Sequence, residues 1–100
     1  MVSGENKQLV DQLCKLIASI DDPIEVKAFL EDLCSSSEIN QMAQRVECAK
    51  LLLEGNTYNK IIAETEISSA TLSRISRCTQ HGSGGYSRTL AQFFGIKTYI

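Results

Sequence analysis

The chain has 100 residues, 43% of them hydrophobic and 22% charged, a composition that predicts one globular domain over residues 1–100. No apolar run approaches the roughly 18 residues of a membrane span, and the polar segment 1–8 lacks a signal-peptide core, so we expect a cytoplasmic protein without a membrane partner. The net charge is −2, but residues 59–100 hold five Lys or Arg against two Asp or Glu, and this basic part favours nucleic-acid binding.

The spacing of apolar residues predicts the first two helices. The first covers about residues 6–20, and the Asp-Asp-Pro sequence that follows ends it. Asp22 suits the N-cap of the second helix, and Pro23 suits its first position. Apolar residues nearly surround the axis of this second helix, which indicates burial on more than one side: Ile24, Val26, Phe29, Leu30 and Leu33.

A second start signal precedes the third helix. Ser35 and Glu38 have the spacing of a capping box, in which each side chain accepts a hydrogen bond from the backbone N–H of the other. Apolar spacing then continues to about Glu54. Gly55 follows at the position where glycine commonly ends a helix. The third helix is therefore expected to end at this glycine.

Two shorter helices are predicted to follow close together. The fourth covers about residues 58–65 and begins after a capping threonine. After a tight break, Ser68 or Ser69 caps a fifth helix that continues through about Thr79. These two helices carry fewer large apolar residues than the first three.

A glycine-rich loop at residues 82–85 separates the fifth helix from the last one, which is expected over about residues 86–94. No strand is predicted, because the β-prone residues after Gly95 form only a short terminal segment. The predicted fold class is therefore all-α, with six helices.

The cysteines are predicted to be free thiols. They are separated by 20, 14 and 30 residues, and the chain holds one histidine, His81. Zinc sites need closely spaced ligands, and disulfide frameworks need an oxidising compartment. We therefore expect no metal or other cofactor, and cysteines that pack as small apolar residues on helix faces: Cys14, Cys34, Cys48 and Cys78.

The segment from Asn59 to Cys78 matches a helix-turn-helix. Two helices that pack at a steep angle need apolar side chains at fixed offsets. Those offsets from Ile61 are filled by Ile67, Leu72 and Ile75. Two positions depart from the common pattern, because Ile62 replaces a small residue and Glu66 replaces the glycine that often makes the turn.

In a helix-turn-helix the second helix lies in the major groove of DNA. Its outer face here would carry small residues that allow close approach to base edges, and arginines that would reach phosphates. We predict DNA contacts by Asn59, Lys60, Ser68, Ser69, Ala70, Thr71, Ser73, Arg74 and Arg77.

Several motifs resemble the Trp repressor superfamily. They are Gln44-Arg45-Val46, Leu51-Leu52-Leu53-Glu54-Gly55, Ile61-Ile62-Ala63-Glu64 and above all Ala70-Thr71-Leu72-Ser73-Arg74. The segment Gly82-Ser83-Gly84-Gly85-Tyr86-Ser87-Arg88 resembles more closely the branch of uncharacterised Trp-repressor-related bacterial proteins. The resemblance covers about residues 33–94 at the level of motifs.

This resemblance implies an intertwined homodimer with two DNA-binding heads. It also implies a ligand site, because Arg45 and Arg74 match the two arginines between which the repressor holds tryptophan. Ser35 matches a nearby hydroxyl-bearing position that helps to hold the amino group of the ligand. Ile75 replaces a glycine of the repressor and would crowd an indole, so we expect any effector to differ from tryptophan.

The sequence holds no nucleophile elbow, phosphate-binding loop or metal motif, so we predict that the protein is not an enzyme. The expected function is a homodimeric, sequence-specific DNA-binding transcriptional regulator, a repressor acting on a double-stranded operator and open to modulation by a small ligand. Dimerisation helices would lie at about residues 6–54 and 86–94, and a DNA-binding head at about 57–79. The alternative is a helical protein-interaction module without significant DNA affinity, which scattered or paired basic charge would favour.

Overall fold

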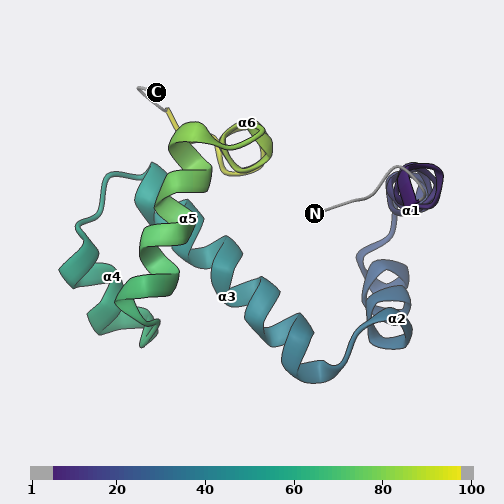
Figure 1. Ribbon diagram of the computed structural model, residues 1–100, viewed down its shortest axis with the longest axis horizontal. Coiled ribbons are helices and arrows are strands. Elements are labelled where there is room, and N and C mark those ends of the chain that lie inside the picture. Colours follow the sequence, from purple (N-terminus) through teal and green to yellow (C-terminus); the bar gives the residue numbers. More distant parts are fainter. Residues whose placement is uncertain (1–5, 98–100) are drawn as a thin grey trace. The chain divides into compact units, whose positions relative to one another are not determined.

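A computed structural model describes residues 6–97 and contains six α-helices in this range (Figure 1). The described residues form no strand, so the predicted all-α, six-helix fold is confirmed. The predicted helix ends agree with the observed ones to within two residues, and α5 is longer than expected because it continues to His81. The helices are α1 (Lys7–Ser19), α2 (Pro23–Leu33), α3 (Ser36–Leu53), α4 (Tyr58–Thr65), α5 (Ser69–His81) and α6 (Gly85–Phe94).

The predicted caps at the starts of α2 and α3 are present. Asp22 Oδ1 accepts a hydrogen bond of 3.0 Å from the Ile24 N–H, and Pro23 is the first residue of α2. Before α3, the Glu38 N–H donates to Ser35 Oγ at 3.1 Å, and the Ser35 N–H donates to Glu38 Oε1 at 2.8 Å. These bonds from the backbone and side chain of Ser35 hold the pKa of Glu38 below its ordinary value of 4.5, because they favour the charged carboxylate.

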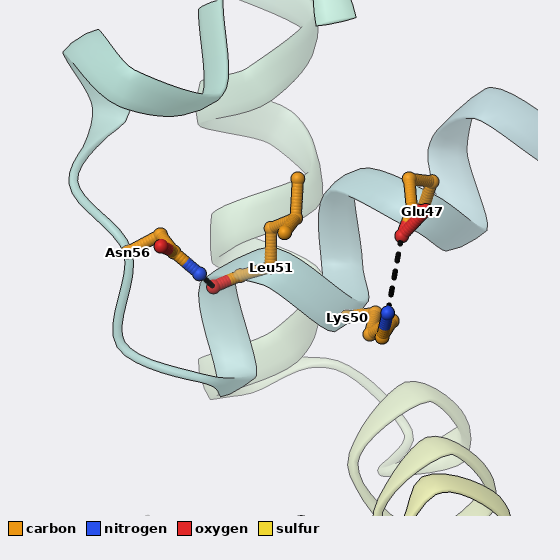
Figure 2. A network of polar contacts seen from close by, with 4 residues as sticks. All are labelled: Glu47, Lys50, Leu51 and Asn56. Carbon is orange, nitrogen blue, oxygen red and sulfur yellow. Dashed lines mark hydrogen bonds and ion pairs between the residues drawn. The ribbon is translucent and has the colours of Figure 1, made fainter. Parts of the chain in front are cut away.

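Hydrogen bonds also fix the end of α3. Gly55 has a φ of +92°, which L-residues with a side chain rarely adopt, and it turns the chain out of the helix. The side-chain amide of Asn56 then donates back to the Leu51 carbonyl at 2.9 Å, as Figure 2 shows. Just before Leu51, the Lys50 side chain forms an ion pair with Glu47, with 3.6 Å between Lys50 Nζ and Glu47 Oε1 (Figure 2). The path from α3 into α4 is therefore held by the backbone and by Asn56.

The chain divides into two compact units after Ile39. In the first unit, none of the residues 6–39 is buried, although α1 and α2 carry many large apolar side chains. Several of these side chains are exposed, namely Leu9, Leu16, Ile17, Ile24 and Leu33. The apolar stripes that predict these two helices are therefore left uncovered within one copy of the chain.

The buried core lies in the second unit, where α4, α5 and α6 gather around the C-terminal part of α3 (Figure 1). All four residues predicted to form the helix-turn-helix core belong to it, and Ile61 and Leu72 are fully buried. Ile62 is half-buried and packs against the edge of the core, which explains how a large residue is accommodated there. The core residues are Cys48, Ala49, Leu53, Ile61, Ile67, Leu72, Ile75 and Leu90.

Candidate nucleic-acid interface and adjoining cleft

The turn between α4 and α5 has a residue with unusual backbone geometry. Glu66 has a φ of +60° and a ψ of 17°, the left-handed conformation, and it is the only residue other than glycine with a positive φ among residues 6–97. The position predicted to favour glycine therefore adopts the conformation for which glycine is suited. A side chain in this conformation costs about 1–2 kcal/mol, so the turn contains local strain. The sharp change of direction lets α5 follow α4 directly.

A serine cap starts α5. The Thr71 N–H donates to Ser68 Oγ at 3.2 Å, and Ser68 Oγ donates to Thr71 Oγ1 at 2.8 Å. The cap is therefore Ser68, and Ser69 is the first helical residue. The backbone N–H groups of Ser69 and Ala70 have no acceptor among residues 6–97, as expected in the first turn of a helix. Such free donors can bind an anion such as a phosphate.

α5 buries one face, which includes the predicted core residues Leu72 and Ile75, and exposes the other. Its inner face buries Leu72, Ile75, Ser76 and Thr79 against the rest of the second unit. The residues predicted to contact DNA remain on the outside, with Thr71 half-buried and the others exposed: Asn59, Lys60, Ser68, Ser69, Ala70, Ser73, Arg74 and Arg77. The structure thus brings the predicted set onto α4, the turn and one side of α5. Their role in DNA contact stays a prediction.

The basic side chains of this surface are not neutralised by carboxylates. Among residues 6–97 the only ion pair joins Lys50 to Glu47, within α3. Lys60, Arg74 and Arg77 therefore have no ion-pair partner in the described part of the chain. Pairing of this charge with the acids of α3 would have favoured a protein-interaction module, and it is not observed.

Arg45 of α3 and Arg74 of α5, the two arginines predicted to hold a ligand, line the same cleft. The cleft has a volume of about 280 Å³ and is formed by Arg45, Ala70, Thr71, Arg74, Ile75, Cys78 and Tyr86. Arg45 is half-buried on α3, whereas Arg74 is exposed on α5. Ile75 is only 3% exposed, so it is both a wall of the cleft and a part of the core.

The charged groups of this cleft suit an anion. The two guanidinium groups donate hydrogen bonds only, and the hydroxyls of Thr71 and Tyr86 are also able to donate. Planar guanidinium groups match the geometry of a carboxylate or a phosphate. Ile75 lines the same cleft, and its crowding of an indole stays a prediction.

Ser35 belongs to the first unit, where its hydroxyl accepts the Glu38 N–H in the cap of α3. Its predicted role in ligand binding stays a prediction.

Tyr86 and Cys78 were not predicted to line the cleft. Helical spacing shows that Cys78 shares a face with Thr71 and Arg74, but the approach of Tyr86 depends on the packing of α6.

The cysteines are free thiols, as predicted, but only one is a core residue. Cys48 is fully buried, which confirms packing as a small apolar side chain. Cys14 and Cys78 are exposed, so the prediction that they pack on helix faces is wrong within a single copy. For Cys78 the cause is its position on the cleft side of α5, away from Leu72 and Thr79. It also borders a second cleft of about 350 Å³, together with Arg74, Arg77, His81 and Gly82.

The sequence profile of the Trp repressor protein family matches residues 8–93. The chain belongs to the Trp repressor family. The match includes the cleft, the whole helix-turn-helix and all but the last residue of α6. The resemblance predicted from the motifs is therefore confirmed.

Three known proteins are similar to most of the chain. This chain is 47% identical over 81 residues to the uncharacterised protein YerC of Bacillus subtilis (strain 168), and the aligned part covers 81% of this chain and 78% of YerC. The crystal structure of a candidate Trp repressor from Staphylococcus aureus is similar with a TM-score of 0.81 at 32% identity, covering 96% of this chain and 99% of that one. The crystal structure of a TrpR-like protein from Eubacterium eligens ATCC 27750 is similar with a TM-score of 0.85 at 37% identity. The match covers 96% of this chain and 100% of that one.

No helix in the described residues of this Trp repressor family member is both long and apolar enough to cross a membrane.

Proposed function

We propose that the chain is a sequence-specific DNA-binding transcriptional regulator that represses from an operator site. The observation that carries this proposal is the placement of α5, which is anchored by one buried face and presents small residues and two arginines on the other. Membership of the Trp repressor family supports a DNA-binding regulator. The absence of carboxylate partners for Lys60, Arg74 and Arg77 among residues 6–97 favours DNA over an acidic face of the same chain.

The proposed contacts follow from the chemistry of each side chain. Ser69, Ala70 and Ser73 are small enough to let α5 approach base edges in the major groove. Arg77 and Lys60 are exposed and would contact phosphates. The free N–H groups of Ser69 and Ala70 would also face the backbone of the DNA. Ser73 is the residue that we expect to influence sequence preference most.

We further propose that the protein acts as a homodimer with the dimerisation helices at about residues 6–54 and 86–94. Residues 6–39 bury no side chain within one copy. Their uncovered surface includes an apolar groove of about 460 Å³ to which Ile20, Val26, Leu30 and Ile39 contribute. Phe93 at the end of α6 is 78% exposed. Exposed apolar surface of this extent is typical of an interface. Light scattering at micromolar concentration should give twice the chain mass of 11.0 kDa, and a monomer would contradict this proposal.

The cleft between Arg45 and Arg74 is proposed to hold a small anionic effector. Its donors suit a carboxylate or a phosphate, and it borders the outer face of α5, so an occupied cleft would affect the DNA-binding surface. This part of the proposal is secondary to DNA binding and is tested separately by titration of ligands.

Selection of bound sequences from a random double-stranded DNA pool tests the main proposal. The selection is run with and without small metabolites from a cell extract. Enrichment of one sequence supports a specific regulator, and dependence on the metabolites supports an effector. Ser73→Ala should change the enriched sequence more than the overall affinity, because a good base contact discriminates by about 1–3 kcal/mol. Absence of enrichment under both conditions would favour the alternative, a protein-interaction module.

A further inference from the structure

A hydrogen bond from α3 fixes the end of α4. The side-chain amide of Gln44 donates to the Thr65 carbonyl at 2.9 Å. Thr65 is the last residue of α4, where carbonyl groups have no partner within the helix. Gln44 therefore satisfies a carbonyl that the helix cannot satisfy, and it joins two elements that are 21 residues apart in sequence.

The side chain of Thr65 strengthens this attachment. Its hydroxyl donates to the Ile61 carbonyl at 2.6 Å and accepts the Ile67 N–H at 3.4 Å. Cys48, one helical turn after Gln44 on α3, donates its thiol to the same oxygen at 3.7 Å. One face of α3 thus holds both the carbonyl and the hydroxyl of Thr65.

The attachment at Thr65 determines where α5 begins. The next residue, Glu66, has left-handed geometry, Ile67 is buried in the core, and Ser68 already caps α5. Such a short and constrained turn transmits the position of the α4 end to the start of α5. We propose that Gln44 is a positioning residue for DNA binding, whose amide holds the helix-turn-helix in the orientation that fits the operator. This inference rests on the proposed function.

The expected energetic effect of Gln44 is on orientation rather than on folding. Gln44 is exposed, and the core of the second unit does not depend on it. Loss of its hydrogen bond would leave the fold intact and reduce the fraction of heads in the competent orientation. The apparent dissociation constant for the operator rises in inverse proportion to that fraction. Non-specific binding depends on phosphate contacts and tolerates a range of orientations.

The test compares Gln44→Leu and Gln44→Glu with the unaltered protein. Leucine removes the donor, whereas glutamate keeps the shape but cannot donate to a carbonyl. Hydrogen exchange is measured at the Glu66 and Ile67 amides, and dissociation constants are measured for the selected operator and for an unrelated duplex at one salt concentration, well below the melting temperature.

We expect both Gln44 variants to speed exchange at these two amides by roughly three- to tenfold, because one net hydrogen bond to local stability is lost. The operator dissociation constant should rise at least about threefold, in inverse proportion to the fraction of heads that keeps the competent orientation, while that of the unrelated duplex changes less than about twofold. Unchanged exchange would overturn the attachment, and faster exchange with unchanged operator affinity would overturn its role in DNA binding.

An equal loss for both duplexes would also overturn the positioning role, because it would show a general effect. If the unaltered protein binds no DNA, the proposed function and the DNA-binding part of this inference both fail. The exchange measurement then still decides whether Gln44 holds the turn.

Discussion

Arg45 of α3 and Arg74 of α5 line one cleft, and neither forms an ion pair with a carboxylate among residues 6–97. Two like charges that border the same small volume repel each other, and an anion between them would relieve the repulsion. The cleft is therefore suited to a ligand of opposite charge. Its apolar wall, Ile75, sets the shape that such a ligand can have.

Tryptophan should bind the unaltered protein weakly or not at all, because Ile75 occupies space that an indole would need. Overpacking typically costs about 1–3 kcal/mol. Calorimetric titration with tryptophan checks this, and micromolar affinity would show that Ile75 leaves room for the ring. Ile75→Ala should open the cleft, although it also removes core packing and costs about 2–4 kcal/mol of folding stability. The variant is therefore titrated after its folding has been checked by circular dichroism.

Arg77→Ala should reduce the salt dependence of DNA binding. A phosphate contact contributes about −0.9 to the slope of log affinity against log salt concentration. The loss of one contact should therefore reduce the magnitude of this negative slope by about one. Affinity for all sequences should weaken alike. Lys15 on α1 provides the matched control, and Lys15→Ala should leave the slope unchanged. A slope that is also unchanged for Arg77→Ala would identify this arginine as a solvated surface charge.

Glu66→Gly should stabilise the second unit by about 0.5–1 kcal/mol. It relieves a left-handed conformation that costs about 1–2 kcal/mol, whereas the added flexibility of the unfolded chain opposes this by about 0.4–1 kcal/mol. Glu64→Gly, two residues earlier in α4, should instead destabilise by about 1 kcal/mol, because glycine is unfavourable inside a helix. Urea denaturation measures both. Equal destabilisation by the two variants would contradict the strain assigned to Glu66.

Ser68→Ala should destabilise α5 by about 0.5–2 kcal/mol, because it removes the oxygen that accepts the Thr71 N–H. Ser69→Ala should have little effect, since this residue lies inside the first turn and provides no cap. Thermal unfolding of the two variants distinguishes them. A larger loss for Ser69→Ala would place the start of α5 one residue later.

Acid should weaken the start of α3 through Glu38. Its pKa is lowered by the hydrogen bonds from Ser35, so its contribution to stability is fully present above the ordinary value of 4.5 and is lost as the pH falls through the lower pKa of the folded state. The protection of the Glu38 amide against hydrogen exchange, measured relative to its intrinsic exchange rate, should therefore decrease as the pH falls below this range. Glu38→Gln should abolish this pH dependence, and its persistence in that variant would assign it to another group.

The sequence predicted features that depend on neighbouring residues and missed those that depend on the packing of distant helices. Helical spacing placed Leu72 and Ile75 on the buried face of α5, because one buried face repeats with the turn of the helix. The fixed offsets of the helix-turn-helix placed Ile61 and the turn residue Ile67 in the same core. Capping followed in the same way from short-range chemistry at Ser35 and three other sites.

The contacts of Tyr86 with the cleft and of Gln44 with Thr65 were not predicted. Each joins elements far apart in the chain, and their meeting depends on helix crossing geometry that local periodicity does not encode. The shared cleft of Arg45 and Arg74 followed only from the family resemblance. Residue spacing alone would have left Arg45 as an ordinary charge on the face of a helix.

The uncovered apolar surface of residues 6–39 has a consequence for the abundance of active protein. If α1 and α2 fold against a second copy, folding and association are a single reaction, and its extent depends on total protein concentration. Dilution would then act as a denaturant and expose these helices to proteases. Doubling the rate of synthesis would more than double the amount of dimer near the midpoint, so the regulator would respond to its own expression as a threshold.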